Sequence, residues 1–150
     1  MIKNIKASNF RSLKDANIDF APLTFVYGNN AAGKSSIFYA FNVLRNILVN
    51  PNQPTDSFFD LGFANLGSFN DVVFRHDVNN PISISVSAKI DKVSFDYGIS
   101  IKGTKGTFTL NVGKPYGLAL ELPVAFPYAI NANTQSEVVL EEIHYKISWN

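Results

Sequence analysis

Apolar and polar residues alternate with great regularity in the second half of the chain. Ile82, Ile84, Val86, Ala88 and Ile90 are separated by Ser83, Ser85, Ser87 and Lys89. A period of two is typical of a strand with one buried face. Asp91-Lys92 and the stretch 103–106 read as turns that lead into further strands over 93–101 and 107–112. The pattern therefore predicts three strands in an antiparallel meander.

The N-terminal part of the chain also contains apolar runs of strand length. Residues 2–9 alternate and predict a first strand. Its candidate core positions are Ile2, Ile5 and Ala7. A turn over 9–12 leads into a second strand over 16–20, and 23–27 follows Pro22 as an apolar run that predicts a third, buried strand.

The segment 36–49 has the apolar period of a helix instead. Ile37, Phe41, Leu44 and Leu48 form one stripe, which Ala40, Val43 and Ile47 widen. Because this helix is apolar on most sides, we expect it to be buried between sheets. Asn50-Pro51 ends it, since the residue before a proline is disfavoured in the helical region.

The other segments carry weaker patterns. Residues 51–63 are rich in turn formers and predict a loop with an exposed Phe58-Phe59 pair. The stretch 68–71, Ser-Phe-Asn-Asp, has the spacing of a capping box and predicts a short helix over 69–75. Residues 114–133 hold three prolines and are expected to be irregular or edge-like, and 138–149 to form the last strand.

Together these elements predict an α/β fold of the mixed α+β type. One central helix packs against a mixed sheet, and an antiparallel meander is added to it. Within a single domain over 1–150, residues 1–50 form a strand–loop–helix core and residues 81–150 an antiparallel sheet. This order differs from the regular strand–helix alternation of kinases and Ras-like GTPases.

Composition narrows the class of protein. The chain of 150 residues contains 13 Phe, is 46% hydrophobic and only 17% charged, which indicates a large core or apolar surface that something else covers. A net charge of +1 gives no general attraction to nucleic acid or anionic membranes. There is no cysteine and no stretch long enough for a signal peptide or a membrane span. We expect a cytoplasmic protein.

The most specific motif lies between the segments 23–27 and 36–49. It is the phosphate-binding loop G-x-x-x-x-G-K-[ST], here Gly28, Asn29, Asn30, Ala31, Ala32, Gly33, Lys34 and Ser35. The glycines let backbone N–H groups approach a polyphosphate, and the start of the helix adds unpaired N–H groups and the positive end of its dipole. Lys34 would reach the β- and γ-phosphates, and the Ser35 hydroxyl would ligate Mg²⁺. The Asn30 amide either donates to a terminal phosphate or caps the loop.

Several segments around this loop combine in a recognisable way. They are Ile5-x-Ala7-x-Asn9-Phe10-Arg11-Ser12-Leu13, the loop followed by Ser36, and Asn65 to Val73 followed by Arg75-His76-Asp77. This combination resembles the N-terminal lobe of ABC-type ATPases of the RecF/RecN/SMC class. The likeness is greatest to the RecF-like AAA ATPases that include the overcoming-lysogenization-defect nucleases and related phage-defence ATPases. It covers roughly the first ninety residues well and the rest only as a sheet pattern.

The resemblance implies a ligand, partners and further site residues. ATP and Mg²⁺ would be the ligands, with Asn30 at the γ-phosphate and Ser36 at the α-phosphate. Asn9, Arg11 and Ser12 would lie near the phosphates or the adenine side of the pocket. The class also implies a C-terminal lobe, ATP-dependent dimerisation with a second copy, and DNA handling in repair, DNA maintenance or phage defence.

Two parts needed for hydrolysis in this class are not found in the sequence. There is no LSGG-like signature segment, and the one candidate for a Walker B strand, 138–142, has Glu141 where aspartate is expected. We interpret Glu141 and Glu142 as solvent-facing acids on a strand and Gln135 as an ordinary loop residue; the alternative is that Glu141 and Glu142 end a Walker B strand and that Gln135 is a coordinating glutamine. The C-terminal lobe is thus expected to be absent and the isolated chain not to hydrolyse ATP.

Two other functions remain as alternatives. A stand-alone small kinase or GTPase would need an Asp-bearing strand after the helix, and neither an Asn-Lys-x-Asp stretch nor an arginine-rich lid is present. A scaffold module would use its β-rich half as a partner surface, although the intact loop argues against this. His76 and His144 lack a carboxylate cluster at metal-ligand spacing and are expected to be structural or exposed.

Overall fold

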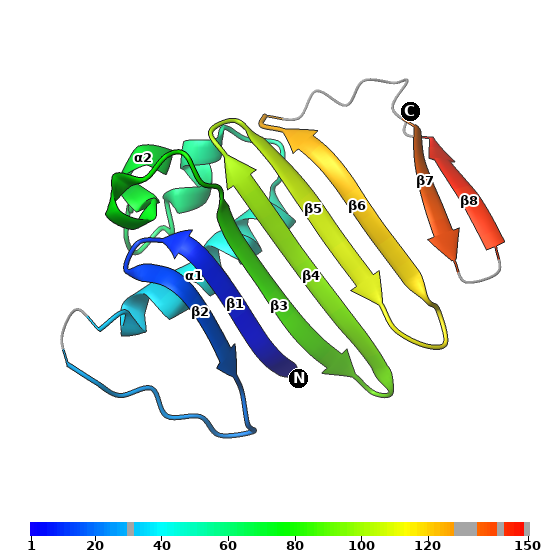
Figure 1. Cartoon of the computed structure of the whole chain (residues 1–150), viewed down its shortest axis with the longest axis horizontal. Helices are drawn as coiled ribbons and strands as arrows, with labels where there is room; N and C mark the ends of the chain where they lie inside the picture. Colours follow the sequence, from blue (N-terminus) through cyan, green and yellow to red (C-terminus); the bar gives the residue numbers. More distant parts are fainter. Residues whose placement is uncertain (30–31, 128–134, 141–142, 149–150) are drawn as a thin grey trace.

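An antiparallel sheet forms the frame of the chain (Figure 1). The computed structural model describes residues 1–29, 32–127, 135–140 and 143–148. The strands are β1 Ile2–Phe10, β2 Leu13–Asp19, β3 Ile82–Ile90, β4 Val93–Lys102, β5 Lys105–Val112, β6 Leu118–Ala125, β7 Gln135–Leu140 and β8 Ile143–Ser148. They make one eight-stranded sheet in the order β2-β1-β3-β4-β5-β6-β7-β8. The mixed α+β class is therefore confirmed.

All pairings between the described strands are antiparallel, so the expected mixed sheet is not found in this part of the chain. The predicted meander of β3, β4 and β5 is confirmed, with a two-residue turn at Asp91-Lys92. A row of directly opposed residues crosses the sheet: Ala7, Ile84, Ile99, Phe108 and Leu122. Because the residues of one register row point to the same face, the alternation seen in the sequence becomes one apolar face of the sheet.

The helical segments are α1 Lys34–Val49, η1 Thr55–Phe59, α2 Phe69–Val72 and η2 Phe74–His76. In Figure 1, α1 crosses behind β1 and β3, whereas β6, β7 and β8 extend beyond it. The side of α1 that faces the sheet is fully buried, through Ala40, Val43, Leu44 and Ile47. Ile5 and Ala7 are buried as predicted. Ile2 is exposed, because the pairing of β1 with β3 shifts register between Ile2 and Asn4.

The expectation that α1 is buried on most sides is wrong. Phe38, Leu48 and Val49 are 55%, 53% and 72% exposed. The reason is that the described residues form one sheet, which covers one side of the helix. α1 therefore presents an apolar outer face to solvent.

The Phe58-Phe59 pair was expected to be exposed, yet both side chains are completely buried. The segment η1 folds back onto α1, where Asn46 Nδ2 donates to the carbonyl oxygens of Phe58 (3.1 Å) and Asp60 (2.9 Å). The Phe58 ring meets the ring of Phe126 edge to face at 4.9 Å. Two hydrogen bonds from one helix side chain thus fix a turn whose aromatic residues complete the core.

The short helix α2 begins where the capping box predicted it. Ser68 N and Ser68 Oγ both donate to Asp71 Oδ2, at 2.8 and 2.7 Å. These two hydrogen bonds from Ser68 hold the pKa of the Asp71 carboxyl below its usual value, and the nearby His76 adds to the effect. The helix ends at Val72, three residues before the predicted Arg75, which adopts a left-handed φ of +53° inside η2.

The C-terminal part differs from the prediction in two places. Within the stretch 114–133, which was expected to be irregular or edge-like, residues 118–125 form the regular strand β6, which is edge-like in its pairing with β7. Pro123 is tolerated there because β6 pairs along its length with β5 but meets β7 only at Ala119↔Val139. The single strand expected over 138–149 is instead the hairpin of β7 and β8. Across the described helices, none is both long and apolar enough to cross a membrane.

Replacing Phe58 by alanine should destabilise the fold by about 3–5 kcal/mol, because it empties a fully buried aromatic site. The matched control is Phe38→Ala, at a ring 55% exposed on α1, which should change the free energy of unfolding by less than about 0.5 kcal/mol. Urea denaturation of both variants gives the comparison. Equal losses would mean that η1 does not belong to the core.

Candidate functional site

The glycine-rich loop leads directly into α1, as the motif requires. Gly28, Asn29 and Ala32 are exposed, Gly33 is buried as the N-cap residue of α1, and Lys34 is its first helical residue. Asn30 and Ala31 lie outside the described residues. Helix α1 thus begins two residues earlier than predicted, so that Lys34 and Ser35 both belong to its first turn.

Gly33 connects the loop to the sheet. Its φ of +88° lies in the left-handed region, where a side chain is strained. A Cβ at this position would lie 3.1 Å from Ser12 Oγ and 3.2 Å from Leu13 Cδ2. The turn between β1 and β2 therefore packs directly against the start of α1, and glycine is needed both for the backbone angle and for this close approach.

The N-terminus of α1 carries no cap. The Gly33 cap position makes no side-chain hydrogen bond, and the first turn contains no acidic residue. The first recorded helical bond is from Ile37 N to Gly33 O, so in the described part of the chain the N–H groups of Lys34, Ser35 and Ser36 have no acceptor. Unpaired N–H groups at a helix start carry partial positive charge and favour an anion. The short helix α2, by contrast, is capped by Ser68 and Asp71.

The Lys34 side chain folds back over the loop. Its Nζ donates to Gly28 O at 2.7 Å and to Asn29 O at 2.6 Å. A further hydrogen bond, from Ala32 N to Asn29 O at 3.2 Å, closes the bend. An ammonium group has three donors, so a third remains for an anion held against the loop. The lysine both shapes the loop and places positive charge beside it.

The two serines after Lys34 have different surroundings. Ser35 is exposed in the first turn of α1. Ser36 is buried, and its Oγ lies 2.8 Å from Ser12 Oγ. Ser12 thus reaches the start of α1 from the β1–β2 turn. The Ser35 hydroxyl is available to a ligand, while the Ser36 hydroxyl is engaged with the protein.

Arg11 also lies at this junction, whereas the Asn9 side chain does not. Arg11 has a φ of +52°, and its N–H donates to Val72 O at 2.6 Å. Its guanidinium stacks over the Tyr39 ring of α1, 5.2 Å from the ring centroid. Asn9 Nδ2 instead donates to the carbonyl oxygens of Asp77 and Asn80. Asn9 therefore anchors the segment before β3, which differs from the place near the phosphates that the resemblance implied.

The segment 23–27 is the clearest difference from the sequence prediction. It belongs to no strand, and Leu23, Phe25 and Tyr27 are 72%, 78% and 91% exposed. Its described hydrogen bonds are local, between Ala21 and the Thr24 side chain. The prediction of a buried strand is wrong for the described structure because no neighbouring strand lies beside this segment to pair with it.

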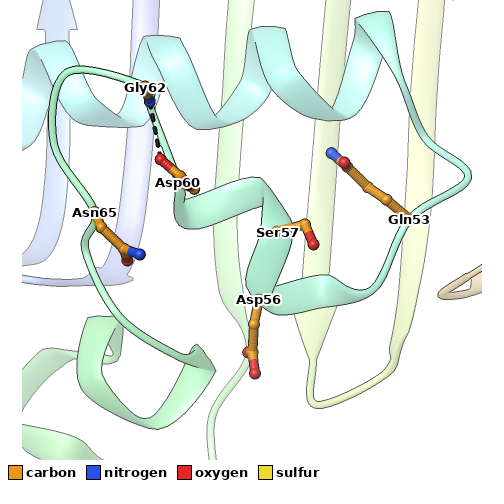
Figure 2. Close-up of a pocket in the computed structure, with 6 residues that line it drawn as sticks. All are labelled: Gln53, Asp56, Ser57, Asp60, Gly62 and Asn65. Atoms are coloured by element: carbon orange, nitrogen blue, oxygen red, sulfur yellow. Dashed lines mark hydrogen bonds between the residues drawn. The ribbon is translucent and has the colours of Figure 1, made fainter.

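A second concave region lies under η1 and is built of polar residues. The cavity, of about 560 Å³, is lined by Gln53, Asp56, Ser57, Asp60, Gly62 and Asn65 (Figure 2). Asp60 Oδ1 accepts from Gly62 N at 3.0 Å, and Asp56 Oδ1 accepts from Phe69 N at 2.8 Å. Both carboxylates therefore accept hydrogen bonds from backbone N–H groups. Nowhere in the described ranges do three or more metal-ligating side chains gather.

The remaining candidates lie away from the loop or outside the described residues. Glu141 and Glu142 are outside them, and Gln135 is the first residue of β7. His76 is exposed, with Nδ1 3.0 Å from Asn70 O, which agrees with a structural role. Tyr39 belongs to none of the sequence motifs. Its position four residues after Ser35, on the same face of the helix, was the available signal.

The chain is similar to known ATPases. The AAA ATPase domain family matches residues 1–146. The DNA double-strand break repair Rad50 ATPase of Methanococcus maripaludis is 51% identical over 43 residues, which are 28% of this chain and 4% of that protein. The chain therefore corresponds to only a small part of this relative's length. The resemblance to ABC-type ATPases seen in the sequence is confirmed by these matches.

The contact between Gly33 and the β1–β2 turn can be separated from backbone strain. Gly33→Ala should destabilise the fold by about 1 kcal/mol more than Gly62→Ala, because Ser12 and Leu13 must also shift. Gly62 is the matched control, since its φ is +80° and a Cβ there meets nothing within 4 Å. Urea denaturation measures both losses. Equal destabilisation would show that the loop is not packed tightly on the turn.

Proposed function

The chain belongs to the AAA ATPase domain family, and from this premise we propose that it is the ATP- and Mg²⁺-binding N-terminal lobe of a RecF/SMC/Rad50-like ABC-type ATPase. The observation that carries the proposal is the start of α1. The 16-residue helix begins directly after the glycine-rich loop with no acidic residue and no side-chain cap, and within the described residues the N–H groups of its first turn have no acceptor. A polyphosphate supplies the negative charge that this helix end lacks.

The residues at the loop fit this ligand. We assign Gly28, Asn29, Asn30, Ala31, Ala32 and Gly33 to the cradle of backbone N–H groups, and Lys34 to the β- and γ-phosphates. The exposed Ser35 hydroxyl would ligate Mg²⁺, which takes few protein ligands and neutralises phosphate charge. Ser36 would act at the α-phosphate through its N–H group, since its hydroxyl contacts Ser12. Arg11 and Ser12 would contact the nucleotide from the β1–β2 turn.

We further propose that a C-terminal lobe covers the exposed apolar surfaces. Segment 23–27 belongs to no strand and is largely exposed, and the outer face of α1 presents Phe38, Leu48 and Val49 to solvent. An apolar groove of about 220 Å³ also opens between the end of α1 and β4–β6, where Leu110, Leu120 and Leu122 line it. Apolar patches of this kind mark surfaces that a partner covers. A strand from that lobe would pair with 23–27 and bury it.

In the proposed two-lobe ATPase, nucleotide binding and hydrolysis depend on different lobes. The described lobe would bind ATP, while the C-terminal lobe would supply the Walker B acids and the signature loop, the latter from a second copy in a head-to-head dimer. The whole protein would then act in DNA repair, DNA maintenance or phage defence. The likeness to a DNA double-strand break repair ATPase supports the first of these settings.

Nucleotide binding should depend on Lys34. We expect Mg-ATP to bind with micromolar or weaker affinity, and the variant Lys34→Ala to bind roughly tenfold to hundredfold more weakly, because charged hydrogen bonds to phosphate are lost. Isothermal titration calorimetry gives the affinities. Lys14→Ala is the matched control, since it removes the same charge from the exposed side of β2.

Thermal unfolding provides a second measurement of Mg-ATP binding. Mg-ATP at about 100 times its dissociation constant should raise the free energy of unfolding of the wild type by about 2.7 kcal/mol. Equal binding by wild type and Lys34→Ala would refute the assignment of the loop. Lys34-dependent ATP turnover by the isolated chain would instead refute the division between lobes.

The covering lobe can be tested through Phe25. In the isolated chain Phe25→Ser should change stability by less than about 0.5 kcal/mol, because the ring is 78% exposed. In a protein that includes the C-terminal lobe, the same change should destabilise by about 2–4 kcal/mol, because the ring is then buried. Tyr116→Ser, at a ring 61% exposed in the turn before β6, is the control for both forms. An equally small effect of Phe25→Ser in the two proteins would exclude burial of this segment.

A further inference from the structure

Side chains from three separate parts of the chain lie against one another on the N-terminal half of α1. The Arg11 guanidinium lies over the Tyr39 ring, 5.2 Å from its centroid. The Tyr39 ring in turn lies 6.2 Å from the Phe63 ring, with 38° between their planes. Arg11 comes from the β1–β2 turn, Tyr39 from α1, and Phe63 from the loop after η1.

The backbone holds Arg11 in a fixed place despite strain. Its φ of +52° is unfavourable for a residue with a side chain, and the hydrogen bond from its N–H to Val72 O, at 2.6 Å, maintains it. In the described part of the chain no carboxylate forms an ion pair with the guanidinium, whose recorded contact is the Tyr39 ring. A cation–π contact uses no hydrogen-bond donor, so the N–H groups of the guanidinium stay available to an anion.

Tyr39 lies on the same side of α1 as Ser35. It lies four residues after Ser35, so the two residues are neighbours on adjacent turns. Side chains on a helix lean toward its N-terminus. A side chain at this position leans toward the turn that carries Ser35, and the Arg11 guanidinium lies over its ring.

Phe63 lies in a turn that several hydrogen bonds stabilise. Asp60 and Asn65 form an isolated bridge, Leu61 N donates to Ala64 O at 3.0 Å, and Gly62 N donates to Asp60 Oδ1 at 3.0 Å. This tight turn holds Phe63 at its tip, where the side chain is 68% exposed. So exposed a ring contributes little to the core, and its recorded partner is Tyr39.

We propose that Tyr39, supported by Phe63, is a positioning residue that holds the Arg11 guanidinium ready to contact the nucleotide phosphates. This role rests on the proposed nucleotide site. A free arginine side chain samples many rotamers, and ordering it on binding reduces affinity. The stack orders the guanidinium before the ligand arrives. Tyr39 itself need not touch the nucleotide.

A double-mutant cycle tests whether Tyr39 acts through Arg11. Affinity for Mg-ATP is measured for wild type, Tyr39→Leu, Arg11→Gln and the double variant. We expect Tyr39→Leu to weaken binding about three- to tenfold, the range of a cation–π interaction. The double variant should bind like Arg11→Gln alone, because the ring has nothing left to position. Tyr39→Phe, which keeps the ring, should bind within about twofold of wild type.

The stack also has a signature that does not involve nucleotide. The NMR signals of the Arg11 Hδ protons should be shifted upfield by the ring in wild type and Tyr39→Phe, and return to ordinary positions in Tyr39→Leu. Phe63→Leu, at an exposed site where unfolding is not expected, should move these signals part of the way.

The experiments distinguish failure of the positioning role of Tyr39 from failure of the proposed nucleotide site. Lys34-dependent binding that Tyr39→Leu does not weaken, or multiplied losses in the double variant, would overturn the positioning role alone. Absence of Lys34-dependent binding by the wild type would overturn the proposed function and this role with it. Unshifted Arg11 signals in the wild type would show that the stack does not exist in solution.

Discussion

The close contact between the β1–β2 turn and the first turn of α1 is the constraint on which the candidate site depends. Gly33 adopts a left-handed backbone against Ser12 and Leu13, and the hydroxyls of Ser12 and Ser36 lie 2.8 Å apart. This contact joins a helix terminus to the sheet without a capping side chain. This contact positions the groups of the candidate site. Lys34 directly follows Gly33 and bonds back to the loop. Arg11 directly precedes Ser12 and contacts Tyr39 of α1.

The N-termini of the two α-helices differ in how their first N–H groups are satisfied. Helix α2 is satisfied internally by the capping box of Ser68 and Asp71. Helix α1, four times as long, starts without a cap or an acidic residue. A glycine at the N-cap costs only a few tenths of a kcal/mol relative to a capping side chain, and an anionic ligand offsets this cost when it accepts hydrogen bonds from the N–H groups of the first turn. The difference between the two helices is therefore physical support for a polyphosphate at α1 that does not rely on the motif alone.

A core built from one sheet and one main helix leaves apolar surface uncovered. On the inner side, Phe58, Phe59 and Ile47 are completely buried. On the outer side, the large aromatic side chains of Phe25 and Tyr27 are largely exposed to solvent. The same sequence can show both because burial requires a partner layer, and the described residues supply that layer on one side of α1. The further lobe that we propose on the other side would account for the high phenylalanine content and the low charge.

Local chemistry was enough to predict the elements whose pattern is periodic or whose residues bond to near neighbours. The alternation over 82–90, the helical stripe of α1, the glycine-rich loop and the Ser68–Asp71 cap all belong to this group. Only the tertiary structure decided features that depend on which segments meet. The burial of Phe58 and Phe59 needs Asn46 and Phe126, the exposure of 23–27 reflects a missing neighbour, and the pairing of β6 follows from β5. The stack of Arg11, Tyr39 and Phe63 joins residues up to 52 positions apart, so a short-range pattern carries no signal for it.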